Sequence, residues 1–571
     1  MSTAAHQTMS RMMLLLPLLL TTFVAAQNDR PPNFLYIMAD DLGYNDVSWH
    51  NPQVLTPNLG KMAKNGVILT ESYSQAACTP SRASYMTGYY PFRIGVQNSV
   101  VREGMEDYVP LDVDFLPKRL KEAGYVSHLV GKWHLGHCRR DVTPPGRGFD
   151  TFLGLLNGYN DYYTKKIRAI ASHEDFDPNA PGTIYDFFSN YTLQPSPETD
   201  YTTDIFTNRA IELIQQSKDT PFFLALHYTA PHWPLQKHPG FSDKDYPDVK
   251  DLNRRIYLSS ITAMDTGIGK VVDALKQHNL LDNTLIVFQS DNGGDTHFSA
   301  NNGPLRDRKT TLYEGGVKVP SMAYGPGLLT NTPRTSDDLF HISDWFTTIL
   351  SAAGLEAGNV DGIDQWNLLR YGSKSPRQTF IYNIHGDNAA IRAGRYKLIE
   401  GNPKAFQARR RRRSVDVLDQ DLAVHGSALT RHKRDEEFVD RRPYESDEDK
   451  VMKAFSSLTG LKKLEQIRPT GDWTMDSILS VLEKIRPDQV KVQADCHKCQ
   501  LYNLTADPSE KKDLVKEKPA VVLFMHTLLE LYKAEEVEPV LAYPFKKDAR
   551  FRGTELHRHH LVRNRLRWTP T

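Results

Sequence analysis

The sequence of 571 residues is poor in cysteine, with four in all: Cys78, Cys138, Cys496 and Cys499. So few cysteines exclude a small scaffold in which disulfides replace a hydrophobic core. An excess of charge of one sign is missing too, because 70 lysines and arginines face 69 aspartates and glutamates, for a formal net charge of +1. This balance excludes a general attraction to nucleic acid, so any effect of charge must be local.

Long apolar runs are absent beyond the N-terminus, so we expect no transmembrane segment in the mature chain. The first residues have the order of a cleavable signal peptide: Arg11, then an apolar run over Met12–Ala26 that ends in small residues. A membrane anchor is the less favoured interpretation, because this run is short for a bilayer. We predict a signal peptide over residues 1–26 and a lysosomal or extracellular location. In that compartment the sequons at Asn190 and Asn503 become glycosylation candidates.

Four short apolar runs, each too short for a helix and each ended by polar residues, predict buried parallel strands over 34–38, 125–130, 222–227 and 284–288. Segments with apolar residues near helical spacing predict helices over 114–123, 203–216, 252–277 and 343–353. This alternation predicts an α/β fold with a large, mainly parallel sheet flanked by helices. Because ligands bind beyond the carboxyl ends of such strands, the polar clusters that follow the strands are expected to form one site.

A distinctive motif begins at Cys78, in Cys78-Thr79-Pro80-Ser81-Arg82, and continues to Thr87-Gly88. The proline suits the first turn of a helix, and a helix N-terminus favours an anion. With the first five residues alone, a buried cysteine before an ordinary helix would be the simpler interpretation. The full stretch resembles the signature of the type I sulfatases, in which the secretory pathway oxidises the cysteine to formylglycine. Gly131–Gly136 and Pro304–Arg306 look most similar to the arylsulfatase B group.

Hard oxygen donors follow two of the predicted strands, at Asp40, Asp41, Asp291 and Asn292. Such ligands select calcium or magnesium over softer metals. An isolated Asp-Asp pair is more often a turn or a helix cap. These four residues, however, match the metal ligands of the sulfatase family, and the resemblance implies one calcium ion with Cys78 as a further ligand.

The resemblance also implies a catalytic set of Cys78, Arg82, Lys132, His134, His232 and Lys309. A hydroxyl of the hydrated formylglycine would attack sulfur, with Arg82 favouring its ionised form and Lys132 holding oxygens of the diol and the sulfate. His232 and Lys309 would help the departing alcohol, and His134 would take the proton that re-forms the aldehyde. Each of these lysines and histidines alone is more often a surface or structural residue.

The resemblance implies hydrolysis of sulfate monoesters within an alkaline-phosphatase-like fold, with sulfated N-acetylgalactosamine in glycosaminoglycans as the expected substrate. Small sulfated metabolites remain an alternative substrate class. A secreted polyanion-binding protein with an unmodified cysteine is a second alternative, whereas a phosphatase or phosphodiesterase would carry serine or threonine at position 78. The expected partners are a sulfated carbohydrate or small sulfate ester and, during secretion, a formylglycine-generating enzyme, with no nucleic acid.

The chain changes character near residue 379. Short strand candidates at 380–384, 389–393 and 396–400, joined by tight turns, predict an antiparallel sheet, and 518–534 an amphipathic helix. We therefore expect a catalytic domain over 27–378 and a smaller C-terminal domain over 379–545. A charged, exposed insertion over 403–447 and a basic tail over 546–571 complete the prediction. Cys496 and Cys499 are expected to form a local disulfide rather than a zinc or redox pair.

Overall fold

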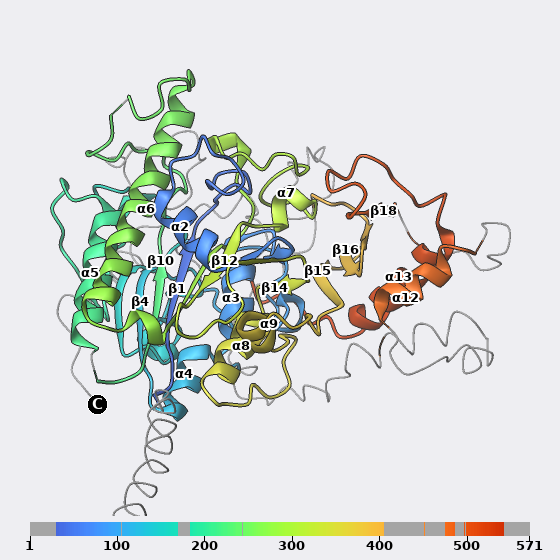
Figure 1. Cartoon of the computed structure of the whole chain (residues 1–571), viewed down its shortest axis with the longest axis horizontal. Coiled ribbons are helices and arrows are strands. Elements are labelled where there is room, and N and C mark those ends of the chain that lie inside the picture. The colour runs from blue at the N-terminus through green and yellow to red at the C-terminus, as the bar shows by residue number, and fades with distance from the viewer. Residues whose placement is uncertain are drawn as a thin grey trace, which may run out of the picture.

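The computed structural model describes residues 30–103, 106–168, 183–217, 219–242, 244–404, 450, 474–485, 496 and 498–541. The predicted signal peptide, nearly all of the charged insertion and the basic tail lie outside the described residues. Figure 1 shows a large sheet with helices on both faces and, to one side, a smaller unit built from the C-terminal elements. Within the described ranges, no helix has the length and apolar character needed to cross a membrane.

The large sheet has ten strands in the order β13-β2-β12-β11-β1-β10-β4-β5-β8-β9. Its central strands are parallel: β11 (Thr284–Ser290), β1 (Asn33–Ala39), β10 (Phe222–His227), β4 (Val126–Lys132) and β5 (Thr151–Leu155). Antiparallel pairings begin where β12 joins β11 and where β8 joins β5. The outer strands are β12 (Ser321–Tyr324), β2 (Val67–Leu69), β13 (Arg334–Ser336), β8 (Phe188–Ser189) and β9 (Thr192–Leu193). The predicted mainly parallel sheet is confirmed.

Strand β1 divides two hydrophobic cores, because successive side chains of a strand point to opposite faces. Phe34, Tyr36 and Met38 face one core, with α3 (Cys78–Thr87), α4 (Leu116–Leu120), α8 (Asp344–Ala352) and α9 (Trp366–Tyr371). Leu35, Ile37 and Ala39 face the other, with α2 (Pro57–Asn65), α5 (Thr202–Gln216) and α6 (Leu252–Gln277). The parallel sheet is therefore covered on both faces.

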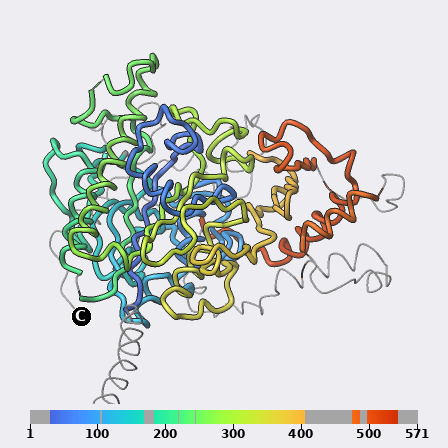
Figure 2. The backbone as a smooth tube through the Cα atoms, viewed as in Figure 1, coloured from blue at the N-terminus to red at the C-terminus, as the bar shows by residue number. Residues whose placement is uncertain are grey.

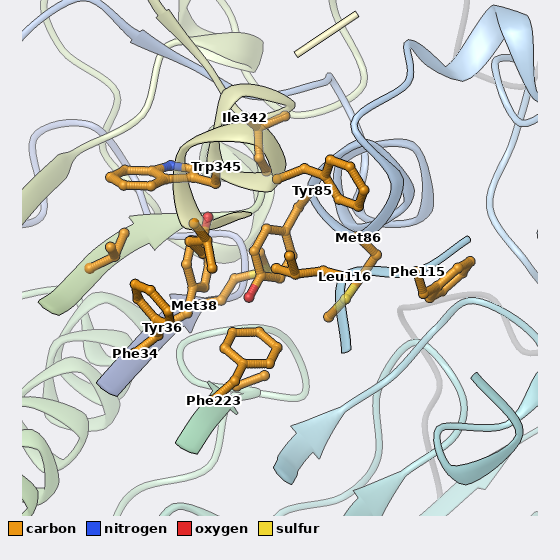
Figure 3. Packing of buried hydrophobic residues seen from close by; sticks show 14 of the residues in the cluster. Phe34, Tyr36, Met38, Tyr85, Met86, Phe115, Leu116, Phe223, Ile342 and Trp345 are labelled. Atoms are coloured by element: carbon orange, nitrogen blue, oxygen red, sulfur yellow. The ribbon is translucent and has the colours of Figure 1, made fainter. Parts of the chain in front are cut away.

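Helix α3 is held against the sheet by aromatic packing. The rings of Tyr36 and Tyr85 are stacked with centroids 4.0 Å apart, and Trp345 of α8 meets Tyr36 edge-on at 5.8 Å. Figure 3 shows these rings gathered between α3, α8 and the sheet. This packing fixes the helix whose first residue is Cys78.

The predicted helix over 114–123 is shorter than expected. Helix α4 begins at Leu116, with Pro117 in its first turn, and a single 3-10 turn over Lys121–Ala123 follows it. Gly124 then adopts the left-handed conformation, with φ 77°, which ends the helix. Helix α6 matches its predicted bounds.

The C-terminal unit contains a four-stranded antiparallel sheet of β15 (Thr379–His385), β16 (Asn388–Ala393), β17 (Tyr396–Glu400) and β18 (Gln500–Asn503). Helices α12 (Met475–Leu482) and α13 (Pro519–Lys533) pack against it, in a core shared with Tyr73, Phe92 and Leu312 of the main part. Figure 2 shows the orange and red C-terminal chain lying directly beside the main part. Cys496 and Cys499 form the expected local disulfide.

Two further pairs of short strands and one short helix complete the described strands and α-helices. Strand β3 (Ser72–Tyr73) pairs with β14 (Phe340–His341), and β6 (Lys166–Arg168) with β7 (Thr183–Tyr185). Helix α7 (Glu314–Val317) lies in Figure 1 on the side of the main part that faces β16 and β18.

Candidate active site

The two pairs of oxygen donors meet at the carboxyl ends of neighbouring strands. Asp40 and Asp41 follow β1, and Asp291 and Asn292 follow β11. The backbone N–H of Asp41 donates to Asp291 Oδ1 (3.3 Å), and Asn292 Nδ2 donates to Asp41 Oδ1 (2.7 Å). Asp41 has φ 61°, an uncommon conformation for a non-glycine residue, and these bonds help to hold it. The predicted convergence of strand-end clusters is therefore present.

Cys78 lies beside these carboxylates at the start of α3. Its Sγ is 3.7 Å from Asp40 Oδ1, and its side chain is buried. Burial, with a further contribution from Asp291, raises the pKa of the Cys78 thiol to about 12. As an unmodified thiol, Cys78 would therefore be protonated at neutral pH and a poor nucleophile.

Arg82 follows Cys78 by one helical turn, and its side chain is fully buried. Its Nε and Nη2 lie 3.0 and 2.9 Å from Asp291 Oδ2, and its Nη1 donates to the carbonyl of Lys132 (3.0 Å). Lys132, the last residue of β4, places its Nζ 2.7 Å from Asp40 Oδ2. Burial raises the pKa of Asp40 to about 7, although Lys132 opposes the shift.

The site balances three carboxylates, Asp40, Asp41 and Asp291, against three cations, Arg82, Lys132 and Lys309, all close enough to interact. A bound divalent cation would therefore leave the site positively charged. A positive site in a buried setting favours an anionic ligand.

His134 follows β4 and is held in one tautomer. Its Nε2 lies 2.8 Å from the carbonyl of Val101, which can only accept, so Nε2 carries the proton. Nδ1 is buried and has no hydrogen-bond partner among the residues that the structure describes. Burial, and then Lys132, hold the pKa of His134 well below its usual range. His134 is thus a neutral imidazole with a free lone pair on Nδ1.

His232 and Lys309 lie next to each other, and both contact Asp41. Lys309 Nζ is 2.7 Å from Asp41 Oδ1, and His232 Nε2 lies 3.4 Å from both Lys309 Nζ and Asp41 Oδ2. His232 Nδ1 donates to the carbonyl of Trp233 (2.5 Å), which leaves Nε2 as an acceptor when the ring is neutral. Burial lowers the pKa of His232 to about 3, so Lys309 is the protonated member of the pair.

The carboxylate and amide oxygens of the site fit a hard cation. One ligand atom from each of Asp40, Asp41, Cys78 and His232 lies within 4.8 Å of the others. Asn292 Oδ1, next to this group, is buried without a hydrogen-bond partner in the described part of the chain. Orphaned buried oxygens beside carboxylates suit calcium or magnesium. Asp291 lies outside this group of four and directs Oδ2 at Arg82.

Comparison with known proteins identifies the family. The sequence model described as Sulfatase matches residues 32–355, more than half of the chain. The chain belongs to the sulfatase family. Membership implies a metal ion and a formylglycine, and the residues described above fit both.

Among individual sulfatases, the chain is 36% identical over 398 residues to arylsulfatase J of Mus musculus, a match that covers 65% of this chain and 64% of the relative. It is 33% identical over 355 residues to N-acetylgalactosamine-6-sulfatase of Homo sapiens, covering 60% and 65%. The chain thus spans slightly less than two thirds of these relatives. A crystal structure of Ps i-CgsB in complex with k-i-k-neocarrahexaose superposes with a TM-score of 0.66 at 25% identity, covering 93% of this chain and 99% of that one.

The structure of this sulfatase brings every predicted site residue to one place, but it also shows neighbours that the sequence did not indicate. The carbonyl of Val101 sets the tautomer of His134, and a Cβ added to Gly158 would lie 2.7 Å from the His134 ring. A backbone carbonyl and a close-packed glycine leave no motif, so no sequence signal pointed to them. Buried charges around Glu314 were missed for the same reason, since their partners lie far away in the sequence.

Proposed function

We propose that this protein hydrolyses sulfate monoesters through a formylglycine derived from Cys78 and one calcium ion. The observation that supports it best is the position of Cys78, 3.7 Å from Asp40 in a buried site where lysines and an arginine pair with three carboxylates. An enzyme for an anionic ester needs cations in place before charge develops, and buried cations act more strongly than exposed ones.

The proposed calcium ligands are Asp40, Asp41, Asp291, Asn292 and residue 78. When bound, the ion supplies positive charge that favours ionisation of the hydrated aldehyde, whose hydroxyl is the nucleophile toward sulfur. The Oδ1 of Asn292, buried and unpartnered in the described chain, would gain a partner. Asp291 would act as a calcium ligand while its bond with Arg82 keeps its orientation.

Lys132 and Arg82 differ in what they touch. Lys132 Nζ lies beside Asp40, next to residue 78, and is placed to hold oxygens of the diol and of the sulfate. Arg82 is fully buried and donates to the carbonyl of Lys132, so it orients Lys132 as well as Asp291. Arg82 therefore holds in place the residues that surround residue 78, namely Lys132 and Asp291.

The proton transfers are divided between Lys309 and His134, with His232 in support of Lys309. Lys309 carries the proton in its pair with His232 and is placed to donate to, or neutralise, the departing alcohol oxygen, while His232 orients Lys309 through Nε2. His134 offers an unpartnered Nδ1 that can accept the proton lost when the aldehyde re-forms. Proton donor and acceptor thus lie on different elements of the site.

For the substrate we propose sulfated N-acetylgalactosamine in glycosaminoglycans, as in the arylsulfatase B group. The similarity to proteins named N-acetylgalactosamine-6-sulfatase supports a sulfated amino sugar. The proposal places catalysis in residues 27–378, with a smaller domain over 379–545, and includes passage through the secretory pathway to a lysosomal or extracellular location. A formylglycine-generating enzyme would act on Cys78 on the way.

The test is turnover of sulfate esters by protein secreted from eukaryotic cells. We expect hydrolysis of 4-methylumbelliferyl sulfate and of N-acetylgalactosamine 4-sulfate, and a loss of about a thousand-fold or more in Cys78→Ala. Cys138→Ala is the matched control, because Cys138 is the other free cysteine of the described residues, and it should keep wild-type activity. Absence of turnover with every sulfate ester, in protein that carries the aldehyde, would overturn the proposal. Hydrolysis of steroid sulfates but not of sulfated sugars would reject only the proposed substrate, not the proposed reaction.

A further inference from the structure

Lys309 lies in a segment, residues 304–316, that the C-terminal unit holds by hydrogen bonds on both sides of the lysine. Before Lys309, Arg306 Nη1 donates to the hydroxyl of Tyr502 (3.1 Å) and to the carbonyl of Glu510 (2.9 Å). After it, the backbone N–H of Glu314 donates to Glu510 Oε2 (2.7 Å). Glu510 therefore contacts both ends of the loop that carries Lys309.

Further contacts join the same two regions. The hydroxyl of Ser509 donates to the carbonyl of Pro304 (2.8 Å), and the N–H of Leu312 donates to the carbonyl of Pro403 (2.8 Å). The guanidinium of Arg306 also lies 3.8 Å from the ring centre of Tyr313, at cation–π distance. Segment 304–316 is thus attached to the C-terminal unit along most of its length.

Buried ion pairs fix this attachment. Lys397 Nζ of β17 lies 2.9 Å from Glu314 Oε1 and 2.9 Å from Glu510 Oε1, and all three side chains are almost fully buried. A buried charge that loses its partner is strongly disfavoured, so the unit and the segment separate only with difficulty.

The backbone of the segment needs such support. Asp307 has φ 63° and Thr310 has φ 70°, on either side of Lys309. The left-handed conformation is a genuine outlier for a β-branched residue such as threonine, and it persists where the surroundings impose it. On the other side, the N–H groups of Lys309 and Thr310 donate to the carbonyls of Gly294 (3.2 Å) and Ala76 (2.7 Å) in the main part. The segment is held between the two units.

We propose that Arg306 and Glu510 are positioning residues for Lys309, so that the C-terminal unit completes the active site. This inference rests on the proposed function for the role of Lys309 toward the leaving group. Arg306 and Glu510 act through the backbone of the segment, which fixes Lys309 Nζ against Asp41 and His232. A small displacement of a catalytic group can lower a rate by about a hundred-fold.

The decisive variant is Arg306→Met, which keeps an apolar stem over Tyr313 and removes both bonds to the C-terminal unit. Arg395→Met is its matched control. Arg395 is less exposed than Arg306 and bonds Asp476 and Glu483 at helix α12 instead. Tyr502→Phe is a milder second variant, which removes the acceptor hydroxyl and leaves the ring in place.

Two readouts distinguish positioning from mere stabilisation. Hydrogen–deuterium exchange should become faster in residues 304–316 for Arg306→Met, and less so for Tyr502→Phe, at an unchanged thermal midpoint. With an alkyl sulfate, kcat should fall by about ten-fold or more, with KM unchanged, because a poor leaving group depends on Lys309. With 4-methylumbelliferyl sulfate, whose leaving group departs readily, the fall should be smaller.

Folded Arg306→Met and Tyr502→Phe proteins with wild-type exchange in 304–316 and wild-type dependence on the leaving group would overturn the inference. An equal change in Arg395→Met would overturn it too. If wild-type protein hydrolyses no sulfate ester, the proposed function fails, and the exchange measurement alone then decides whether the C-terminal unit orders the Lys309 segment.

Discussion

Lys132 and Asp40 form a fully buried ion pair, with 2.7 Å between Nζ and Oδ2, beside the sulfur of Cys78. Lys132 ends β4 and Asp40 directly follows β1, and these two strands are separated in the sheet by β10. The pair therefore crosses the carboxyl edge of the sheet and joins the cation that we assign to sulfate binding to a proposed metal ligand. The stability of the site and its proposed chemistry therefore depend on the same contact.

Replacing the lysine of this pair should damage both stability and activity. In Lys132→Met the buried carboxylate of Asp40 loses its partner, and we expect the free energy of unfolding to fall by about 3–5 kcal/mol in the absence of divalent cations. Urea unfolding in EDTA measures the loss. The double variant Lys132→Met, Asp40→Leu should regain much of the stability but no activity. A single variant as stable as wild type would contradict this interpretation of the pair.

Calcium removal should lower both activity and stability. Binding to the folded state stabilises by RT ln(1 + [L]/Kd), or about 2.7 kcal/mol at a hundred-fold excess over Kd. We expect EDTA to lower the thermal midpoint, calcium to restore it, and Asn292→Ala to weaken the response. Asn65→Ala, at an exposed site where Nδ2 donates to the carbonyl of Lys61, is the control. A midpoint that calcium does not change would argue against the ion.

The C-terminal unit should show a pH-dependent stability of its own. The hydrogen bond with Glu400 (2.6 Å) raises the pKa of His526, although burial opposes it. Because the folded pKa is the higher, this contribution is complete below the unfolded pKa of about 6.5 and is lost as pH rises through the folded value.

The contribution of Glu400 to stability changes with pH in the opposite direction. Burial raises its pKa, but His526 and Lys533 outweigh burial and hold the pKa below its usual range. Its contribution is therefore present above the unfolded pKa of about 4.3 and is lost as pH falls through the folded pKa. Thermal midpoints from pH 5 to 9 should decline on the alkaline side in wild type and less in His526→Gln. If the thermal midpoint depended on pH in the same way in both proteins, the coupling of His526 to Glu400 would be rejected.

Two buried tyrosines should respond differently to loss of the hydroxyl. The hydroxyl of Tyr85 in α3 has no hydrogen-bond partner among the described residues, so Tyr85→Phe should leave the free energy of unfolding unchanged or raise it by up to about 1 kcal/mol. Tyr228 shares a hydrogen bond of 2.8 Å with Thr207, and Tyr228→Phe should lower the free energy of unfolding by about 1 kcal/mol. Equal effects in chemical denaturation would show that the hydroxyl of Tyr85 has a partner.

The central strands and long helices could be predicted from the sequence because their patterns are local. Strands β1 and β10 are continuous apolar runs, and α6 has a buried face at helical spacing. Strands β2 and β12 were missed, since they have three and four residues and lie outside the parallel centre. Helix α3 has no amphipathic pattern, because all ten of its residues are buried, and only the motif at Cys78 indicated it.

The members of the site could be predicted for a different reason. Residues that follow parallel strands meet at one edge of the sheet, so Asp40 and Asp291 were expected to lie close together. The protonation states of the site residues, and the contacts that hold these residues in place, could not be predicted in this way. The tautomer of His134 depends on one carbonyl, and the bond from Glu314 to Glu510 spans 196 residues.

The conversion of Cys78 to formylglycine is tested most directly by the mass of the tryptic peptide that ends at Arg82, from protein secreted by eukaryotic cells. We expect formylglycine at residue 78 and an unmodified thiol at Cys138 in the same sample. A thiol at residue 78 in folded, secreted protein would contradict this conversion, and would favour a polyanion-binding protein.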